Sequence, residues 1–287
     1  MNASVRHYTE YVRDNLAEFE LMRTEVTAGD DVLVSRTASE VRENAHRRRE
    51  PGKMSEGPVL VIGATGRTGR LIVDRLVARR VPVYALVRDP AKGREVLPPE
   101  VPQFVGDLRS RATLTEPMAT ARSVISVACG SAEHHNNSPE KVDYHGTCHL
   151  IQEASAADVD LVVFVSTIYA SRPDHYQDVE PTSLGWKAKA EEVLRRSRLP
   201  YCIIRPGWLT DEGGGEPLAV SQGDKVEGRI SRADLADVCT QVLFLPDARG
   251  KTFEVVTGPR GQAPNLASAV EALEPDADAA PSSRAGP

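Results

Sequence analysis

The sequence predicts an α/β protein built on one doubly wound, Rossmann-type parallel sheet, with a helical extension at the N-terminus. Three observations predict this fold. A glycine-rich turn follows a short apolar run at residues 59–63, strand and helix patterns alternate from this run to residue 256, and residues 1–54 carry helical periodicity instead. At 287 residues the chain is long enough to bury the core of one such domain and to carry additional segments.

The glycine-rich turn lies between an apolar run of strand length and a helical pattern. In this context Gly63 permits a tight turn, Gly66 lets the backbone approach a pyrophosphate, and Gly69 lets the helix press on the strand. Free N–H groups and the positive helix end would then face phosphates, so we expect a dinucleotide site rather than a simple packing turn. The residues of this turn expected at the cofactor are Gly63, Thr65, Gly66, Arg67, Thr68 and Gly69.

The remaining elements alternate as a parallel sheet requires. Further strands are expected at residues 82–88, 101–105, 122–127, 161–166, 201–204 and 252–256, and helices at 67–79, 90–96, 111–119, 139–156, 184–197 and 231–244. Ligands bind such sheets beyond the carboxyl ends of the strands, so the residues directly after each strand are the candidates for a site.

Arginines favour NADP(H) as the nucleotide. Arg88 ends the second strand, where an NAD-specific fold presents an acidic residue to the ribose, and together with Arg67 it offers two guanidinium groups to a 2′-phosphate. The alternative is that both arginines are solvated loop residues, and Asp89 could still serve a ribose hydroxyl. After the third strand, Asp107 with Leu108 could meet the adenine amino group, or Asp107 could cap the next helix.

The 54 residues before the domain have a different pattern. Apolar residues recur at steps of three and four over residues 4–22, which predicts an amphipathic helix, and a weaker helix is expected at 37–49. The interpretations are an arm packed on its own domain or on a second subunit, a lid over the substrate cleft, or a disordered tail. We divide the chain into an arm or lid at 1–54, an NADP-binding domain with a substrate cleft at 55–262, and a short C-terminal helix with a disordered tail at 263–287.

Composition and charge limit the partners. The net charge of −6 gives no basic field for nucleic acid or an anionic membrane, and no apolar run approaches the roughly 18 residues of a membrane helix. Without a signal-peptide core we expect a soluble, cytoplasmic protein, in which Cys129, Cys148, Cys202 and Cys239 are free thiols. His145 and His149 could share a helix face near Cys148, but no acidic or cysteine pair matches them at ligand spacing, so we predict no metal site.

Several segments in combination resemble the atypical short-chain dehydrogenases of the NmrA-like branch over about residues 58–257. These segments are the glycine turn, Gly106-Asp-Leu108, Val124–Gly130, Val142–Thr147, Phe164–Thr167, Lys187-x-x-x-Glu191, Ile204–Gly207 and Ser231-x-Ala-Asp-x-Ala236. The resemblance implies one Rossmann domain that binds NAD(P), with Ala128–Gly130 at the nicotinamide, Lys187 at its ribose, and Pro206–Trp208 closing over the ring. The cofactor residues expected beyond the turn are Arg88, Asp107, Leu108, Ala128, Cys129, Gly130, Val165, Ser166, Lys187, Pro206, Gly207 and Trp208.

The usual proton donor of this branch is missing. Reductases of the branch carry Tyr-x-x-x-Lys and a hydroxyl after the fifth strand, but here Ser183 precedes Lys187 by four residues and Ile168 stands where we look for the hydroxyl. A positioned general acid is worth about 10² to 10⁴ in rate. The candidate catalytic residues are Lys187, Tyr169, Tyr176 and His134, with His135 beside the last. For each tyrosine or histidine taken alone, an ordinary loop or packing residue is the favoured interpretation, and a hydroxyl on the substrate could replace them.

Three functions remain open. The first is an NADPH-dependent ketoreductase acting on a bulky, polycyclic aromatic ketone, similar to angucyclinone-type polyketide ketoreductases of antibiotic biosynthesis. The second is a sensor that binds NADP(H) without turnover and passes the redox state to a partner. The third is a quinone or flavin reductase. Whether the chain forms a homo-oligomer is left open.

Overall fold

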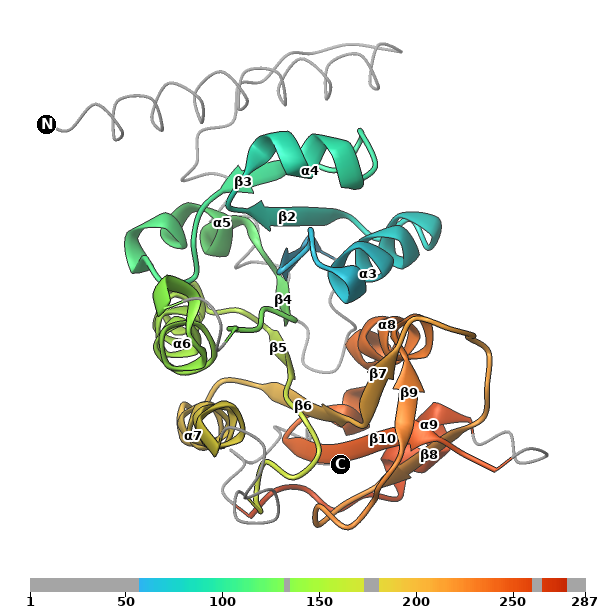
Figure 1. The fold of residues 1–287 in the computed structure, drawn as a ribbon. Helices are drawn as coiled ribbons and strands as arrows, with labels where there is room; N and C mark the ends of the chain where they lie inside the picture. The colour runs from blue at the N-terminus through green and yellow to red at the C-terminus, as the bar shows by residue number, and fades with distance from the viewer. Residues whose placement is uncertain (1–56, 132–134, 173–180, 260–264, 278–287) are drawn as a thin grey trace, which may run out of the picture. The chain divides into compact units, whose positions relative to one another are not determined.

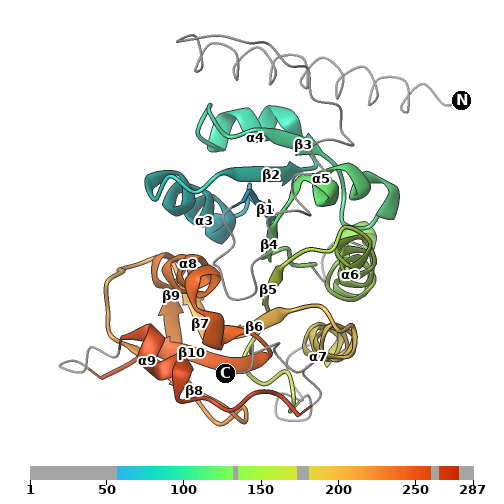
Figure 2. The ribbon, with the colours of Figure 1, turned by 180° about the vertical axis from the view of Figure 1, so that it is seen from behind.

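An eight-stranded sheet is the centre of the described part of the protein (Figures 1 and 2). The computed structural model describes residues 57–131, 135–172, 181–259 and 265–277, all within the unit Met54–Ser282. In spatial order the strands are β3 (Gln103–Val105), β2 (Val83–Val87), β1 (Val59–Ile62), β4 (Ser123–Ser126), β5 (Leu161–Val165), β6 (Tyr201–Pro206), β10 (Lys251–Thr257) and β8 (Leu218–Ser221).

The strand order reverses direction between β1 and β4, which pair in parallel from Val59 opposite Ser123 to Ile62 opposite Ser126. This is the topological switch point of a doubly wound sheet, where the loops after the two strands diverge and leave a crevice. The predicted Rossmann-type fold is therefore confirmed, and the glycine turn after β1 lies at the crevice.

Helices cover both faces of the sheet. One face carries α3 (Arg67–Ala78), α4 (Pro90–Val96), α8 (Arg232–Gln241) and α9 (Leu266–Glu271), and the other carries α5 (Thr115–Thr120), α6 (Thr147–Ala156) and α7 (Pro181–Arg196). Strand β1 serves both layers because its side chains alternate: Val59 and Val61 belong to the first core, whereas Leu60 and Ile62 belong to the second.

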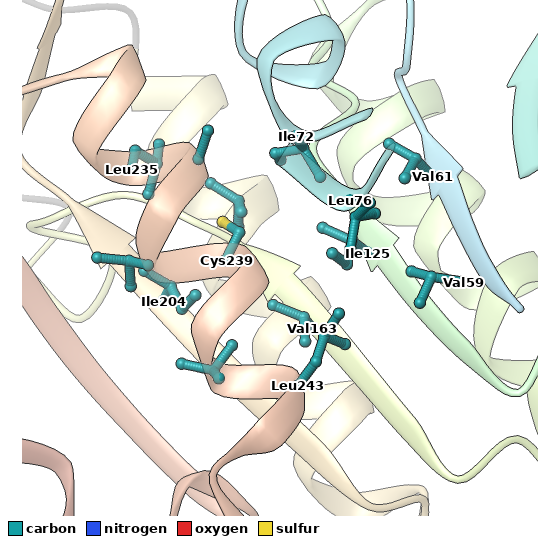
Figure 3. Close-up of a cluster of buried hydrophobic side chains, with 14 of the residues drawn as sticks. Val59, Val61, Ile72, Leu76, Ile125, Val163, Ile204, Leu235, Cys239 and Leu243 are labelled. Carbon is teal, nitrogen blue, oxygen red and sulfur yellow. The ribbon is translucent and has the colours of Figure 1, made fainter. Parts of the chain in front are cut away.

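The first core joins α3 to α8 over the middle of the sheet. Figure 3 shows Ile72 and Leu76 of α3, Leu235 and Cys239 of α8 and Ile125 of β4 in one cluster of buried side chains. All five side chains are fully buried, and burial of one large aliphatic side chain contributes about 1.5–3 kcal/mol. The apolar face of α3 therefore fixes the helix, and with it the position of the glycine turn.

Polar contacts set where α8 begins and how it meets α3. The Ser231 hydroxyl accepts a hydrogen bond from the Asp234 amide at 2.9 Å and so caps the helix. The Arg75 guanidinium of α3 donates to both carboxylate oxygens of Asp237, at 2.9 and 3.3 Å. The motif beginning at Ser231 therefore fixes the start of α8, and Asp237, directly after the motif, aligns α8 with α3.

All seven predicted strands and six predicted helices are present, with boundaries shifted by a few residues. Three strands were missed: β8 pairs antiparallel with β10, while β7 (Trp208–Thr210) and β9 (Arg229–Ser231) form a small parallel sheet of their own. These strands are three or four residues long, and their neighbourhood includes three glycines with positive φ at 213–215, so they carry no clear strand periodicity.

Three predicted helices are not uniform, since the one expected at 231–244 continues after α8 as a 3₁₀ turn. The helix expected at 111–119 begins as a 3₁₀ turn, η1 (Arg111–Thr113), and the helix expected at 139–156 begins as a π-helix, η3 (Glu140–Gly146). Short 3₁₀ turns also form η2 (His135–Asn137), η5 (Val242–Phe244) and η6 (Pro246–Ala248). The predicted arm at 1–54, His134, Tyr176 and the final residues of the predicted tail lie outside the described residues. In the described ranges no helix is both long and apolar enough to cross a bilayer.

Candidate functional site

The glycine turn has the geometry that its three glycines predict. Gly63 adopts φ +85°, and a Cβ there would lie 2.9 Å from the Ala128 nitrogen. A Cβ on Gly69 would lie 2.1 Å from the Gly63 oxygen, so helix and turn are in direct backbone contact. A Cβ on Gly66 would meet only that same oxygen, at 3.1 Å, which leaves the far side of the turn open to a ligand.

Helix α3 presents its first amide groups to this open side. The helix starts at Arg67, and among the described residues no side chain caps it and no acidic residue lies in its first turn. Uncapped N–H groups and the positive end of the helix dipole suit an anion. The arrangement fits the pyrophosphate of a dinucleotide, with Thr65, Arg67 and Thr68 at its edge.

The two arginines expected at the 2′-phosphate each have a protein partner. The Arg67 guanidinium donates to Asp211 at 2.8 Å, and Asp211 also pairs with Arg232 at 2.8 Å. Arg88 donates to the Asn137 side-chain oxygen of η2 at 2.7 Å. The side chains of Arg67 and Asp211 are 63% and 60% exposed, so their ion pair contributes little and is readily exchanged for a phosphate. Their role at the 2′-phosphate stays a prediction.

Asp107 lies near Arg88 after β3, but its carboxylate is largely engaged. It accepts from the Arg109 amide at 2.9 Å and forms an ion pair with the Arg109 guanidinium at 2.5 Å. Burial raises the pKa of Asp107, yet the hydrogen bonds and charge of Arg109 outweigh burial and hold that pKa below its ordinary value. Asp107 does not cap the helix that follows, because Ser110 holds the N-cap position of η1. Leu108 is buried against Gly146, so its side chain belongs to the core.

Lys187 of α7 is a buried cation at the carboxyl ends of β4 and β5. Its ammonium lies 3.4 Å from Oδ1 of Asp143 and 5.8 Å from the centre of the Phe164 ring. Burial lowers the pKa of Lys187, but the charges of Asp143, Cys129 and Glu191 raise it, and the net result lies above the ordinary value. Lys187 is therefore an ammonium at neutral pH, held in one place by a carboxylate.

Sequence reasoning missed Asp143. It lies in the π-helix η3, is almost fully buried, and accepts a hydrogen bond from the Gly130 amide at 3.2 Å as well as contacting Lys187. Its second oxygen, Oδ2, is buried without a hydrogen-bond partner in the part of the chain that the structure describes. The signal was the acidic residue in the segment Val142–Thr147, which the resemblance quoted without assigning it a role.

The segment expected to line the nicotinamide runs between the glycine turn and η3. Ala128 contacts Gly63, and a Cβ on Gly130 would lie 2.5 Å from the Pro139 nitrogen, so both ends of the segment are tightly placed. Cys129 between them is exposed. At the end of β5, Val165 is buried, and so is the Ser166 hydroxyl oxygen, which has no hydrogen-bond partner among the described residues. Such orphaned polar atoms fit a bound cofactor.

Tyr169, the tyrosine candidate within the described residues, is buried. Tyr169 has φ +68°, is 3% exposed, and its amide donates to Asp224 at 2.5 Å. Ile168 is buried at the position where a catalytic hydroxyl was sought. The burial of Tyr169 argues against its role as a proton donor. Of His145 and His149, the first lies against Tyr144 with the two rings tilted by 58°, and the second contacts the Leu108 carbonyl oxygen at 3.1 Å through Nδ1.

Two motifs meet in one buried ion pair. Glu191, one helical turn after Lys187, accepts hydrogen bonds from the Arg205 guanidinium at 3.0 and 2.6 Å. Since Arg205 belongs to β6, this pair aligns Lys187 with the segment Pro206-Gly207-Trp208. The indole of Trp208 is 58% exposed on β7, where it can cover a ligand, and its amide is bound to the Gly228 oxygen at 2.9 Å.

A doubly wound sheet with an uncapped glycine turn at its switch point defines a dinucleotide-binding protein of the Rossmann type. Residues 63–246 match the model of the NAD(P)H-binding family, and the chain belongs to this family. The expected cofactor is therefore confirmed as NAD(P)H, and so is the resemblance at the level of this family.

Three similar proteins illustrate the family. An uncharacterised chloroplastic protein of Arabidopsis thaliana is 32% identical over 229 residues, which cover 71% of this chain and 70% of that protein. The sanguinarine reductase of Eschscholzia californica is 29% identical, with 71% of this chain and 90% of the relative covered. Among solved structures, a putative NAD-dependent epimerase/dehydratase of Bacillus halodurans is 27% identical with a TM-score of 0.67, covering 76% and 100% of the two chains. The chain is thus a member of a family that includes NAD(P)H-dependent reductases.

The comparisons contradict the expected cytoplasmic location. The Arabidopsis relative and three further similar proteins are chloroplastic. The expectation rested on the absence of a secretory signal core and of a long apolar run. Neither absence distinguishes the cytosol from the interior of a plastid. The two observations therefore did not support the expectation of a cytoplasmic protein.

Proposed function

We propose that the protein is an NADPH-dependent ketoreductase whose substrate is a bulky aromatic ketone of the polyketide type, reduced without the usual Ser/Tyr pair. The observation that carries the proposal is the buried Lys187–Asp143 ion pair at the carboxyl ends of β4 and β5, next to the segment that lines the expected nicotinamide site. A relative that is a sanguinarine reductase supports turnover over sensing without turnover.

The residues divide the work as follows. The α3 amides and Gly66 hold the pyrophosphate, Arg88 takes the 2′-phosphate, and Lys187 binds the hydroxyls of the nicotinamide ribose. Reduced nicotinamide supplies the hydride. The ammonium of Lys187 also stabilises negative charge that develops on the carbonyl oxygen, because it lies in a water-poor site where charges interact strongly.

The substrate supplies part of its own activation. With Ser183 in place of tyrosine and Ile168 in place of a hydroxyl, the protein lacks the usual donor pair of the branch, and a positioned general acid is worth about 10² to 10⁴ in rate. A phenolic hydroxyl next to the carbonyl forms an internal hydrogen bond to the oxygen and polarises it. Such hydroxyls are a regular feature of aromatic polyketides, which is why we propose this class.

Two matched ketones test the proposal. 8-Hydroxy-1-tetralone has the internal hydrogen bond and 1-tetralone lacks it. We expect NADPH oxidation with both and a kcat/KM at least about tenfold higher for the hydroxylated ketone, since its internal donor replaces part of a general acid. NADPH binding without oxidation by either ketone contradicts the proposal and favours the sensor. Oxidation only with quinones favours the third function, a quinone reductase.

A further inference from the structure

An exposed cysteine lies within the site and has no role in the function proposed above. Cys129 lies in the loop after β4 and is the exposed member of a segment whose two ends are held by Gly63 and by η3. Its thiol donates to the Gly130 oxygen at 3.3 Å. The other three cysteines are buried or half-buried, so Cys129 is the one that solvent and a ligand reach most readily.

Cys129 is not alone. The buried charges of Lys187 and Asp143 both act on its thiol, and the Gly130 amide beside it is bound to Asp143 at 3.2 Å. The orphaned Oδ2 of Asp143 is an independent sign of a ligand or water at this point, because a buried carboxylate oxygen is seldom left without a donor. A thiol, an ammonium and a carboxylate therefore form one cluster, which we name the Cys129 cluster.

We propose that Cys129 is the proton donor of the reaction, with Lys187 and Asp143 as its positioning residues; this rests on the proposed ketoreductase function. As the carbonyl carbon accepts hydride from reduced nicotinamide, the π electron pair moves to oxygen, and that oxygen takes the proton from Sγ. The products are the alcohol, oxidised nicotinamide and a thiolate. Water then returns a proton to the exposed thiolate, so each turnover consumes one NADPH and one proton.

The electrostatics of the cluster suit a donor. The charge of Lys187 lowers the pKa of Cys129, but the sulfur is partly buried although the residue as a whole is exposed, and this burial raises the pKa. The charge of Asp143 and its hydrogen bond to the thiol raise it further, so the net pKa lies above the ordinary value for cysteine. The thiol therefore holds its proton at neutral pH, and the ammonium of Lys187 is next to the thiolate once that proton has left. Cysteine is among the side chains that act as general acids.

Three acceptors and two variants test the donor role in the full chain. 1-Tetralone needs a proton from the protein, 8-hydroxy-1-tetralone needs it less, and the N-methylphenanthridinium cation needs none, because hydride addition makes it neutral. We expect Cys129→Ala to lower kcat for 1-tetralone by about 10² to 10⁴, to lower it less for the hydroxylated ketone, and to lower it least for the cation. The matched control Cys148→Ala should change none of the three rates.

The outcomes separate the two proposals. If the wild-type chain reduces none of the ketones, the ketoreductase function fails. If it reduces them and Cys129→Ala is as fast with 1-tetralone, or slows all three acceptors equally, only the donor role of Cys129 is overturned.

A second measurement does not depend on turnover. The rate of Cys129 alkylation by iodoacetamide, followed by peptide mass spectrometry against pH, reports the titration of the thiol. We expect Asp143→Asn to move the midpoint to lower pH, because a negative charge next to the thiol is lost, and we expect NADP⁺ to slow the alkylation. An unchanged midpoint in a folded variant contradicts the cluster.

Discussion

Replacing Gly69 by alanine should disturb both folding and cofactor binding. The added Cβ would lie 2.1 Å from the Gly63 oxygen and 2.8 Å from the Ala64 Cα, so helix and turn must separate by about 1 Å to restore ordinary contact. Both partners are backbone, which cannot rotate away. Overpacking of this kind costs about 1–3 kcal/mol, and α3 carries three buried aliphatic side chains, Ile72, Val73 and Leu76, that would lose contact as it moves.

The same movement of α3 should also weaken cofactor binding. The α3 amides that face the pyrophosphate would shift with the helix, and a misplacement of about 1 Å can change a positioned interaction by about 10²-fold. Gly66→Ala is the informative comparison, because its Cβ meets only one atom at 3.1 Å and its φ of −79° suits alanine. This variant should keep wild-type stability and lose NADPH affinity, since the methyl group occupies the space of the pyrophosphate.

Urea unfolding followed by fluorescence, together with NADPH titration, separates the two effects. Gly185→Ala on α7 is the control, because no atom lies within 4 Å of its added Cβ and alanine favours a helix by about 0.5–1 kcal/mol. Wild-type stability in Gly69→Ala, or wild-type NADPH affinity in Gly66→Ala, would refute the roles assigned to these two glycines.

Three further predictions concern charges. Arg88→Ala should weaken NADPH binding by about 10- to 100-fold and NADH binding little in calorimetric titrations, because a charge-assisted bond to the 2′-phosphate is lost; equal losses would exclude that role. Asp211→Asn should tighten NADPH binding by up to about fivefold. The change removes the negative charge that pairs with Arg67, so the guanidinium becomes more available to the 2′-phosphate. Weaker NADPH binding would show that Asp211 assists the site. Burial raises the pKa of Glu254 above its value of 4.5 in the unfolded chain. Between these two pKa values the folded state keeps a proton that the unfolded state has lost. The free energy of unfolding therefore falls as the pH rises from 4.5 through the pKa of the folded state. Glu254→Gln should remove this decline in unfolding experiments across pH, and an unchanged pH profile would show that Glu254 is ionised in the fold.

The layered fold was predictable because its signals are local. The apolar run Val59–Ile62 and the glycine turn after it predict both strand β1 and the start of α3. The alternation of strand and helix patterns that follows predicts a parallel sheet. The antiparallel β8 was not predictable, since it pairs with β10 across a long separation in sequence and its four side chains are all half-buried. Its residues therefore lack the alternation that marks a strand.

The site was predictable only in part, for a physical reason. A sequence motif identifies candidate residues, but the role of each residue also depends on the side chains from distant segments that contact it in the fold. Lys187 was found, whereas its partner Asp143 was hidden in a helical segment, and Arg67 was found without Asp211, which lies 144 residues away. Tyr169 was expected at a cleft, but Asp224 on a later loop binds its amide and holds it in the interior. Contacts between residues so far apart in the sequence leave no local pattern from which they could be predicted.

Transfer of deuterium from nicotinamide to the substrate tests the central claim most directly. NADPH deuterated at C4, prepared separately on each face of the ring, is incubated with the protein and 8-hydroxy-1-tetralone, and the alcohol is examined by mass spectrometry and NMR. The account predicts one deuterium at the carbinol carbon from one of the two labelled faces. An alcohol without deuterium from either face, or no alcohol while NADPH binds, would contradict it.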